Sequence, residues 1–308
     1  MKAVKIDQYG DERVLQLVEV PTPEPAPHEV LIQVQAASVN PVDWKIRDGA
    51  GLRFGMQLPI FLGSEVAGVV AKVGADVTEF RVGDEVYGTV PAGGYADYAL
   101  AQPAALAPKP AALDFAHAAA IPLAALTAWQ ALFEAADLRA GQRVLILGAA
   151  GSVGALAVQL AKAKGASVTG LASGGNEAFV RSLGADEFVD YTAQPFEDVV
   201  SAMDVVLDAV GGDTFTRALR CVKKGGILVT VVAFPTPEQG AGHGIRAVRV
   251  ASRPNRSQLD EISQLVAAGQ LVAQVAQTFP LAQVGAAQEL SKAGHTRGKL
   301  VLLPGSGQ

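Results

Sequence analysis

The sequence contains one strong chemical signal, the glycine-rich turn Gly148-Ala149-Ala150-Gly151-Ser152-Val153-Gly154. It follows the apolar run 143–147 and opens a helical pattern, which is the context that a dinucleotide fingerprint requires. Gly151 would let the backbone approach a pyrophosphate, Gly154 would let helix and strand pack closely, and the helix start favours phosphate charge. The first glycine of G-x-G-x-x-G is displaced, because Ala149 occupies its position. A purely structural turn is the alternative interpretation.

The segment expected to meet the adenosine end of a dinucleotide is 172–176, after the second strand of this region. An NAD site normally has Asp or Glu there, ~20 residues beyond the glycines, to bind both ribose hydroxyls. Here Ser173 and Asn176 form a small polar loop, and the first carboxylate is Glu177. A loop of this kind can admit a 2′-phosphate, so NADPH is the expected cofactor. The loop has no basic residue, and Arg181 either binds the phosphate or lies on the surface.

Two kinds of element must position these residues. The first hundred residues predict short strands divided by glycine and proline, which is typical of a partly closed β-barrel, at 30–36, 65–74, 84–88 and 94–100. After Pro122, near-continuously apolar strands alternate with helices and predict a doubly wound parallel sheet, at 143–147, 167–171, 187–191, 204–208 and 227–232. The tail, with helices near 258–268 and 281–293 and strands near 272–279 and 299–303, could belong to either domain.

The composition excludes several classes of protein. A chain of 308 residues, half of them hydrophobic, suits roughly two domains of ~150 residues each. The 25 basic and 30 acidic residues give a net charge of −5, which argues against nucleic-acid and anionic-membrane binding. A single cysteine excludes an internal disulfide and a cysteine-rich zinc site. The uncharged stretch 115–133 is interrupted by Pro122, so it predicts a buried linker and helix and not a membrane-spanning helix. The charged start 1–7 does not resemble a signal peptide, and a cytoplasmic protein is expected.

Several short segments, taken together with their order along the chain, resemble the medium-chain dehydrogenase/reductases, specifically their zinc-independent quinone oxidoreductase and enone reductase branch. The similarity covers essentially the whole chain and rests on segments 38–45, 63–70, 83–86, 93–98, 182–186 and 297–299 together with the glycine turn. The resemblance implies an α/β chain with a GroES-like barrel over 1–121. It also implies a Rossmann domain over 122–256 with sheet order 3-2-1-4-5-6, and a return of 257–308 to the barrel domain.

Zinc-dependent alcohol dehydrogenases of the same superfamily have a cysteine ligand where this chain has Asn40. Their second ligand is the histidine of Gly-His-Glu, where this chain has Gly63-Ser64-Glu65. Amide and hydroxyl groups are poor substitutes at a zinc site, so no metal is expected. Without zinc, oxidation of an alcohol is difficult, whereas hydride transfer from NADPH to a quinone or to the β-carbon of an enone is easier.

The resemblance also suggests roles for individual residues. Asn40 and Lys45 would donate hydrogen bonds to the acceptor oxygen as negative charge develops there, or Lys45 would hold the nicotinamide ribose. Alternatively, Asn40-Pro41 is only a turn and Lys45 only a surface residue. Asp43 would either orient Lys45 or cap the local helix. Thr127, expected at a helix start, would contact nicotinamide, and Tyr191 the adenosine phosphate. The complete expected cofactor set is Thr127, Ala150, Gly151, Ser152, Val153, Gly154, Ser173, Asn176, Tyr191, Val210, Val232 and Lys299.

The sequence therefore predicts an NADPH-dependent reductase of a small electrophilic acceptor, a quinone or an α,β-unsaturated carbonyl. A homodimer is expected. The alternative is an NADPH-binding regulatory or structural relative with little turnover.

Overall fold

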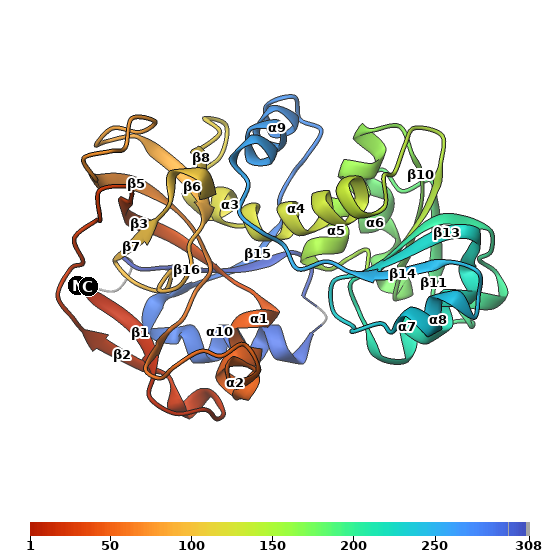
Figure 1. Ribbon diagram of the computed structural model, residues 1–308, viewed down its shortest axis with the longest axis horizontal. Coiled ribbons are helices and arrows are strands. Elements are labelled where there is room, and N and C mark those ends of the chain that lie inside the picture. Colours follow the sequence, from red (N-terminus) through yellow and green to blue (C-terminus); the bar gives the residue numbers. More distant parts are fainter. Residues whose placement is uncertain (295, 306–308) are drawn as a thin grey trace. The chain divides into compact units, whose positions relative to one another are not determined.

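The computed structural model describes residues 1–294 and 296–305 (Figure 1). Its contacts divide the chain into two compact units. Unit 1 contains Met1–Leu123, Pro254–Ala267 and the chain from Ala273 onward. Unit 2 contains Ala124–Arg253 and Ala268–Val272.

Unit 2 is built on a six-stranded parallel sheet in the order β11-β10-β9-β12-β13-β14. Numbered within the unit, this order is 3-2-1-4-5-6, which confirms the expected doubly wound topology. The strands form because runs of Val, Leu and Ile can be buried on both faces of a parallel sheet. Their bounds are β9 Arg143–Leu147, β10 Ser167–Ala172, β11 Glu187–Asp190, β12 Met203–Asp208, β13 Val222–Thr230 and β14 Arg246–Arg249.

The helices of unit 2 connect these parallel strands. The longest, α5 (Ser152–Ala163), buries an Ala-, Val- and Leu-rich face and follows β9 directly. Its sequence has no proline and only one glycine, so the helix continues to Ala163. The other connecting helices are α6 Glu177–Ser182, α7 Gly212–Ala218 and α8 Pro237–Ala241. The helix α4 (Pro122–Trp129) and the π-helical turn η4 (Gln130–Ala135) precede β9.

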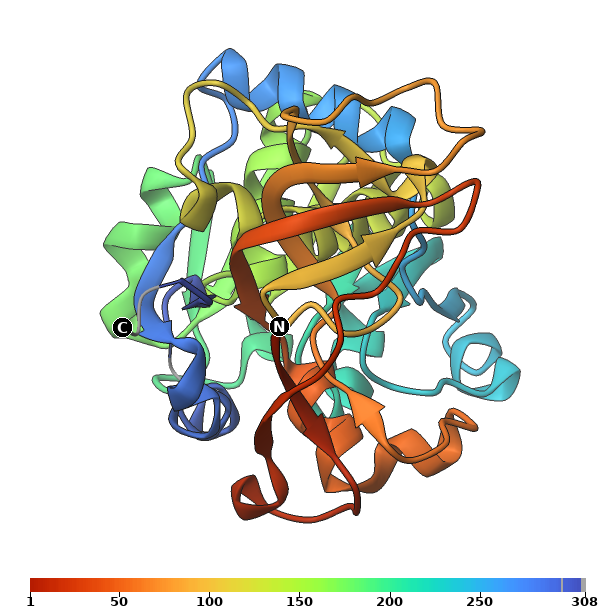
Figure 2. The same ribbon diagram turned by 90° about the vertical axis from the view of Figure 1, so that its left-hand side faces the viewer.

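Unit 1 contains a seven-stranded sheet in the order β15-β16-β3-β5-β6-β8, with β7 also paired to β3, and a small sheet β2-β1-β4 (Figure 2). The tail contributes two of these strands, because β16 pairs antiparallel with β3 and Leu300 lies opposite Val39. The bounds are β1 Lys2–Ile6, β2 Gln16–Glu19, β3 Val30–Val39, β4 Ile60–Phe61, β5 Glu65–Val73, β6 Glu85–Thr89, β7 Tyr98–Ala101, β8 Leu106–Pro108, β15 Val275–Pro280 and β16 Lys299–Leu303.

The helices of unit 1 are short except for two from the tail, α9 (Arg256–Ala267) and α10 (Val284–Ala293). The Tyr87 hydroxyl attaches β6 to α9, because it donates to the Leu259 carbonyl at 3.1 Å. The remaining helices are α1 Pro41–Lys45, α2 Gly51–Arg53 and α3 Phe115–Ala119, with the π-helical turn η2 at Ile46–Ala50 between α1 and α2.

One apolar stretch, Phe115–Ala135, is long enough to cross a membrane by length and composition. It contains α3, α4 (Pro122–Trp129) and η4, and 78% of its most apolar window is buried inside the protein. Burial of this extent is typical of a core helix.

Candidate cofactor and catalytic site

In unit 2, the glycine turn connects β9 to α5. Gly148 has a φ of +76°, and the Gly148 and Ala149 N–H groups both donate to the Leu171 carbonyl of β10, at 3.1 and 3.0 Å. Gly151 is the N-cap of α5, and no side chain caps this end. The first-turn N–H groups of Ser152 and Val153 therefore point beyond the helix start, where they can bind an anionic group.

The turn also passes a steric test for a dinucleotide cradle. A Cβ on Gly154 would lie 2.1 Å from the Gly148 carbonyl oxygen, so only glycine allows helix and strand to approach this closely. A Cβ on Gly151 would lie 3.3 Å from the same oxygen and would cover the helix start. The residues present thus fit a pyrophosphate, and the displaced first glycine does not prevent the turn from forming.

The loop after β10 lies at the expected adenosine end. Ser173 and Asn176 are joined by two hydrogen bonds. The Asn176 side-chain amide donates to Ser173 Oγ at 2.9 Å, and the Asn176 backbone N–H donates to the Ser173 carbonyl at 2.8 Å. Tyr191 follows β11 and is 47% exposed. Arg181 binds Glu177 and the Asp186 carbonyl instead of the loop. A 2′-phosphate here would therefore meet hydroxyl, amide and backbone donors.

Two further loops at the carboxyl edge of the sheet are fixed by a buried pair, Asp208 and Thr230. Asp208 Oδ1 accepts from the Val210 and Gly211 N–H groups at 2.9 and 2.8 Å, and Oδ2 accepts from Thr230 Oγ1 at 2.7 Å. Thr230 Oγ1 accepts in turn from the Val232 N–H at 3.1 Å. These bonds place Val210 and Val232 beyond the ends of β12 and β13, at the edge where such sheets bind ligands.

Unit 1 holds the expected catalytic residues in α1 and at its N-cap. Asn40 is the N-cap residue, and its backbone N–H donates to Asp43 Oδ2 at 2.8 Å. Of the two expected roles of Asp43, the structure thus contains the helix cap. Asp43 also accepts from the Tyr95 hydroxyl at 2.6 Å and from Ser64 Oγ at 3.3 Å, so this carboxyl is held from three sides.

A buried ion pair lies next to this cap. Lys299 of β16 and Glu65 of β5 are 3% and 0% exposed, and their side chains are paired. Lys299 also donates to Asn40 Oδ1, and Glu65 accepts from Ser38 Oγ and from Asn40 Nδ2. The second Asn40 amide hydrogen is directed to the Ser38 carbonyl at 3.3 Å. Both amide hydrogens of Asn40 are therefore used inside the protein.

Burial dominates the electrostatics of Asp43. It raises the pKa of this carboxyl to about 6, against the opposing effects of the Tyr95 and Asn40 hydrogen bonds and the Lys299 charge. The pKa of Tyr95 is raised well above its ordinary value, first by burial and then by the neighbouring Asp43 charge. Tyr95 therefore remains a neutral donor at physiological pH, whereas Asp43 titrates just below it.

Lys45 differs from its neighbours in having an available ammonium group. It is half-buried, its Nζ lies 5.4 Å from the centre of the Trp44 ring, and no other described residue donates to it, accepts from it or pairs with it. Burial lowers its pKa. Lys45 is thus a cation held over an aromatic face with its N–H groups free to bind a ligand.

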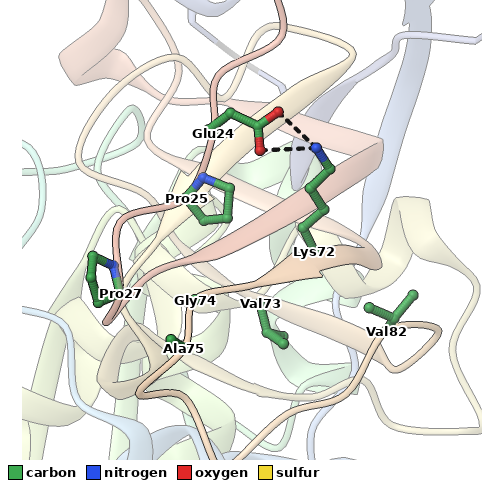
Figure 3. Close-up of a pocket in the computed structure, with 8 residues that line it drawn as sticks. All are labelled: Glu24, Pro25, Pro27, Lys72, Val73, Gly74, Ala75 and Val82. Carbon is green, nitrogen blue, oxygen red and sulfur yellow. Dashed lines mark hydrogen bonds and ion pairs between the residues drawn. The ribbon is translucent and has the colours of Figure 1, made fainter.

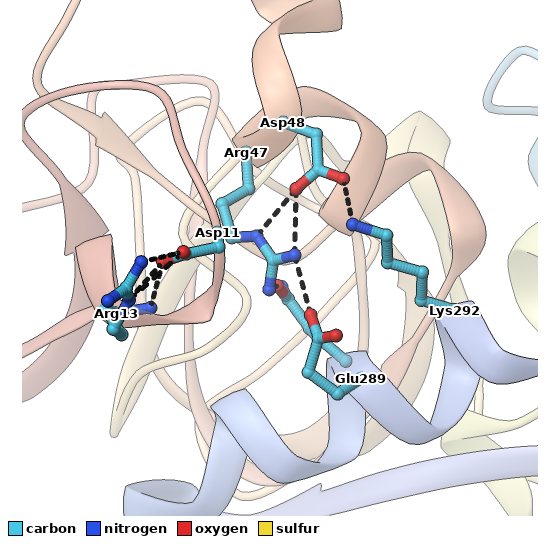
Figure 4. Close-up of polar contacts among 7 residues, drawn as sticks. Asp11, Arg13, Arg47, Asp48, Glu289 and Lys292 are labelled. Carbon is cyan, nitrogen blue, oxygen red and sulfur yellow. Dashed lines mark hydrogen bonds and ion pairs between the residues drawn. The ribbon is translucent and has the colours of Figure 1, made fainter.

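The segment after Lys45 is anchored by alternating charges (Figure 4). The buried Arg47 guanidinium binds Asp48 and Glu289, both at 2.8 Å, and Lys292 donates to Asp48 at 2.6 Å. Because Glu289 and Lys292 belong to α10, the tail helix fixes the turn that follows Lys45. A local sequence pattern does not reveal this long-range contact.

A separate groove of about 470 Å³ lies in unit 1, beside a Lys72–Glu24 ion pair (Figure 3). It is lined by Glu24, Pro25, Pro27, Lys72, Val73, Gly74, Ala75 and Val82, and none of these is a candidate site residue. Within residues 1–294 and 296–305, no group of three or more His, Cys, Asp or Glu side chains could hold a metal ion.

The structure thus brings Asn40, Asp43 and Lys299 together in unit 1, with Lys45 at the end of the same short helix as Asp43. It gathers most of the cofactor set around the sheet edge of unit 2. Thr127 lies inside α4, since this helix begins at Pro122, and the expected helix start at Thr127 is wrong. Sequence reasoning missed the structural importance of Glu65, Tyr95 and Thr230. Glu65 had a signal, because a charged residue opens an otherwise apolar strand.

Comparison with known proteins gives consistent matches. Residues 26–111 match the alcohol dehydrogenase GroES-like domain family, and residues 183–302 match the zinc-binding dehydrogenase family. The chain is 36% identical to the mouse mitochondrial NAD(P)H oxidoreductase RTN4IP1, over 98% of this chain and 89% of that protein. It is 37% identical to a chloroplastic NADPH-dependent alkenal/one oxidoreductase of Arabidopsis thaliana, over 99% and 80%. The solved quinone oxidoreductase of Coxiella burnetii is 37% identical, with a TM-score of 0.92 over 98% and 99%.

Proposed function

Because the chain belongs to the medium-chain dehydrogenase/reductase superfamily, in its zinc-independent quinone and enone reductase branch, we propose that it reduces a quinone or an α,β-unsaturated carbonyl with NADPH. The alkenal/one relative is named as NADPH-dependent, and the Coxiella burnetii relative as a quinone oxidoreductase. The observation that carries the proposal is the free Lys45 ammonium on α1, a helix whose N-cap residue, Asn40, already uses its amide hydrogens in a buried network.

The cofactor would be held by unit 2. Gly151, Ser152 and Val153 would bind the pyrophosphate at the start of α5, and Ser173 and Tyr191 would bind the adenosine phosphate. When bound, NADPH supplies the hydride from C4 of its nicotinamide. The buried Asp208–Thr230 pair keeps Val210 and Val232 in fixed positions, where they would contact the cofactor.

The chain's own contribution to the chemistry is a donor for the acceptor oxygen. Lys45 Nζ would donate a hydrogen bond as negative charge develops on that oxygen, and its lowered pKa makes the proton easier to share. Asn40 and Asp43 act as positioning residues, because their polar groups hold the segment that carries Lys45. Lys299 acts with them from β16, where it pairs with Glu65.

The test is a panel of acceptors with purified protein and either NADPH or NADH. Reduction of quinones, enones or alkenals at rates far above that of a saturated aldehyde supports the proposal. Tight NADPH binding by calorimetry without turnover of any acceptor would favour the alternative, a regulatory or structural relative. Alcohol oxidation that requires added zinc would contradict both.

A homodimer is proposed as well. β14 is the last strand of the unit 2 sheet, and such an edge strand can pair with a second copy. Light scattering after gel filtration tests the assembly state. Cytoplasmic localisation also stays a prediction, because two relatives are named as mitochondrial and chloroplastic. Cell fractionation would measure it directly.

A further inference from the structure

The loop after β10 has a carboxylate beside it that comes from the neighbouring strand. β10 and β11 are parallel, and Ala172 at the end of β10 lies opposite Asp190 at the end of β11. A Cβ built on Gly174 would lie 2.4 Å from Asp190 Oδ2. The Asp190 side chain therefore lies against Gly174, within the loop where an adenosine ribose is expected.

This carboxylate is held in one orientation but is not saturated. Asp190 Oδ1 accepts from the Thr192 N–H at 2.8 Å and from Thr192 Oγ1 at 2.6 Å. These bonds, together with one from the Gly174 backbone, lower the pKa of Asp190, so the group is ionised at neutral pH. In the part of the chain that the structure describes, no side chain donates to Oδ2. Oδ1 is thus anchored by Thr192, while Oδ2, next to the Gly174 backbone, keeps a lone pair that can accept a hydrogen bond from a ligand.

We propose that Asp190 is the ribose-facing carboxylate of this site, replacing the acidic residue that the end of β10 lacks, so that the chain accepts NADH as well as NADPH. This rests on the proposed nicotinamide cofactor. Oδ2 would accept from a ribose hydroxyl of NADH and would repel the 2′-phosphate of NADPH. Arg181 does not offset that repulsion, because it is bound to Glu177 and to the Asp186 carbonyl. Asp190 is therefore the residue that sets the ratio of the two affinities.

The test is Asp190→Asn, with both cofactors titrated by calorimetry and without an acceptor. The amide oxygen can still accept both bonds from Thr192, so this anchor of the loop is retained. We expect the Kd for NADH to rise by roughly 3- to 10-fold, because a neutral hydrogen bond to the ribose replaces a charge-assisted one. The Kd for NADPH should fall by roughly 3- to 10-fold, because one negative charge near the 2′-phosphate is removed. Asp198→Asn is the matched control, because it removes an exposed carboxylate of the same unit and should change neither Kd.

A second variant tests the same geometry by a different route. Gly174→Ala adds a methyl group against Oδ2 and displaces the carboxylate, so it should weaken NADH binding more than NADPH binding. Equal changes in both Kd values, or no change, in Asp190→Asn would overturn the role of Asp190 and leave the proposed function intact. Failure of the unmodified protein to bind either cofactor would overturn the proposed function, and this proposal with it.

Discussion

Replacing Lys299 by methionine removes one partner of the ion pair in the core of unit 1. Glu65 is completely buried and would keep hydrogen bonds from Ser38, Asn40 and the Leu123 N–H, but no cation would balance its charge. Removing one partner of a buried pair costs about 3–5 kcal/mol in the free energy of unfolding. For a unit of this size, that cost lowers the melting temperature by about 6–20 °C.

Two other variants determine whether the cost comes from the unpaired charge. In Lys299→Met/Glu65→Gln neither charge is buried, so the double variant should recover most of the lost stability although it changes more atoms. Lys72→Met is the matched control in the same unit, because Lys72 and Glu24 pair at 2.7 Å while 53% and 73% exposed. An exposed pair of this kind contributes less than about 1 kcal/mol.

The two tryptophans allow unit 1 to be measured separately. Trp44 lies in unit 1 and Trp129 in unit 2, so in a Trp129→Phe background fluorescence during urea unfolding reports unit 1 alone. All variants would be compared in that background, which cancels the effect of the background substitution. If Lys299→Met stays within about 1 kcal/mol of its parent, or the double variant is less stable than the single one, the buried ion pair is refuted.

Three further predictions concern the proposed site. Lys45→Ala should lower kcat/KM by about 10- to 150-fold, the effect of losing one charge-assisted hydrogen bond, and should cost under ~1 kcal/mol of stability. Unchanged kcat/KM would show that Lys45 has no role in the reaction. Because the folded pKa of Asp43 is raised from 3.8 to about 6, stability should fall by up to ~3 kcal/mol as pH rises between these values. Asp43→Asn should flatten that slope in melting curves, and an unaltered slope would assign it to another group. Ser173→Asp should favour NADH over NADPH by repelling the 2′-phosphate, and equal Kd ratios before and after substitution would contradict this.

Local sequence pattern was sufficient for the elements that apolar runs define. β9 forms over the predicted residues, because Val144 to Leu147 are buried on both faces of the sheet. β14 was missed, since Arg246 and Arg249 at its ends leave only two apolar residues between them. β13 begins at Val222, earlier than predicted. The prediction began too late because the first half of this strand carries Lys223, Lys224 and two glycines and does not resemble a buried strand.

The candidate site shows a different limit. The motif around Asn40 correctly places a chemically capable segment, but the hydrogen bonds that decide which group can act come from Glu65 and from Lys299, which is 259 residues from Asn40 in the chain. A local pattern cannot reveal such a partner, because only the pairing of β16 with β3 brings the two residues together. Once that pairing forms, the amide of Asn40 is satisfied internally and Lys45 keeps its N–H groups free. Asn40, at the position of a zinc ligand in the zinc-dependent dehydrogenases, thus supports the site structurally. Lys45 is the hydrogen-bond donor to test.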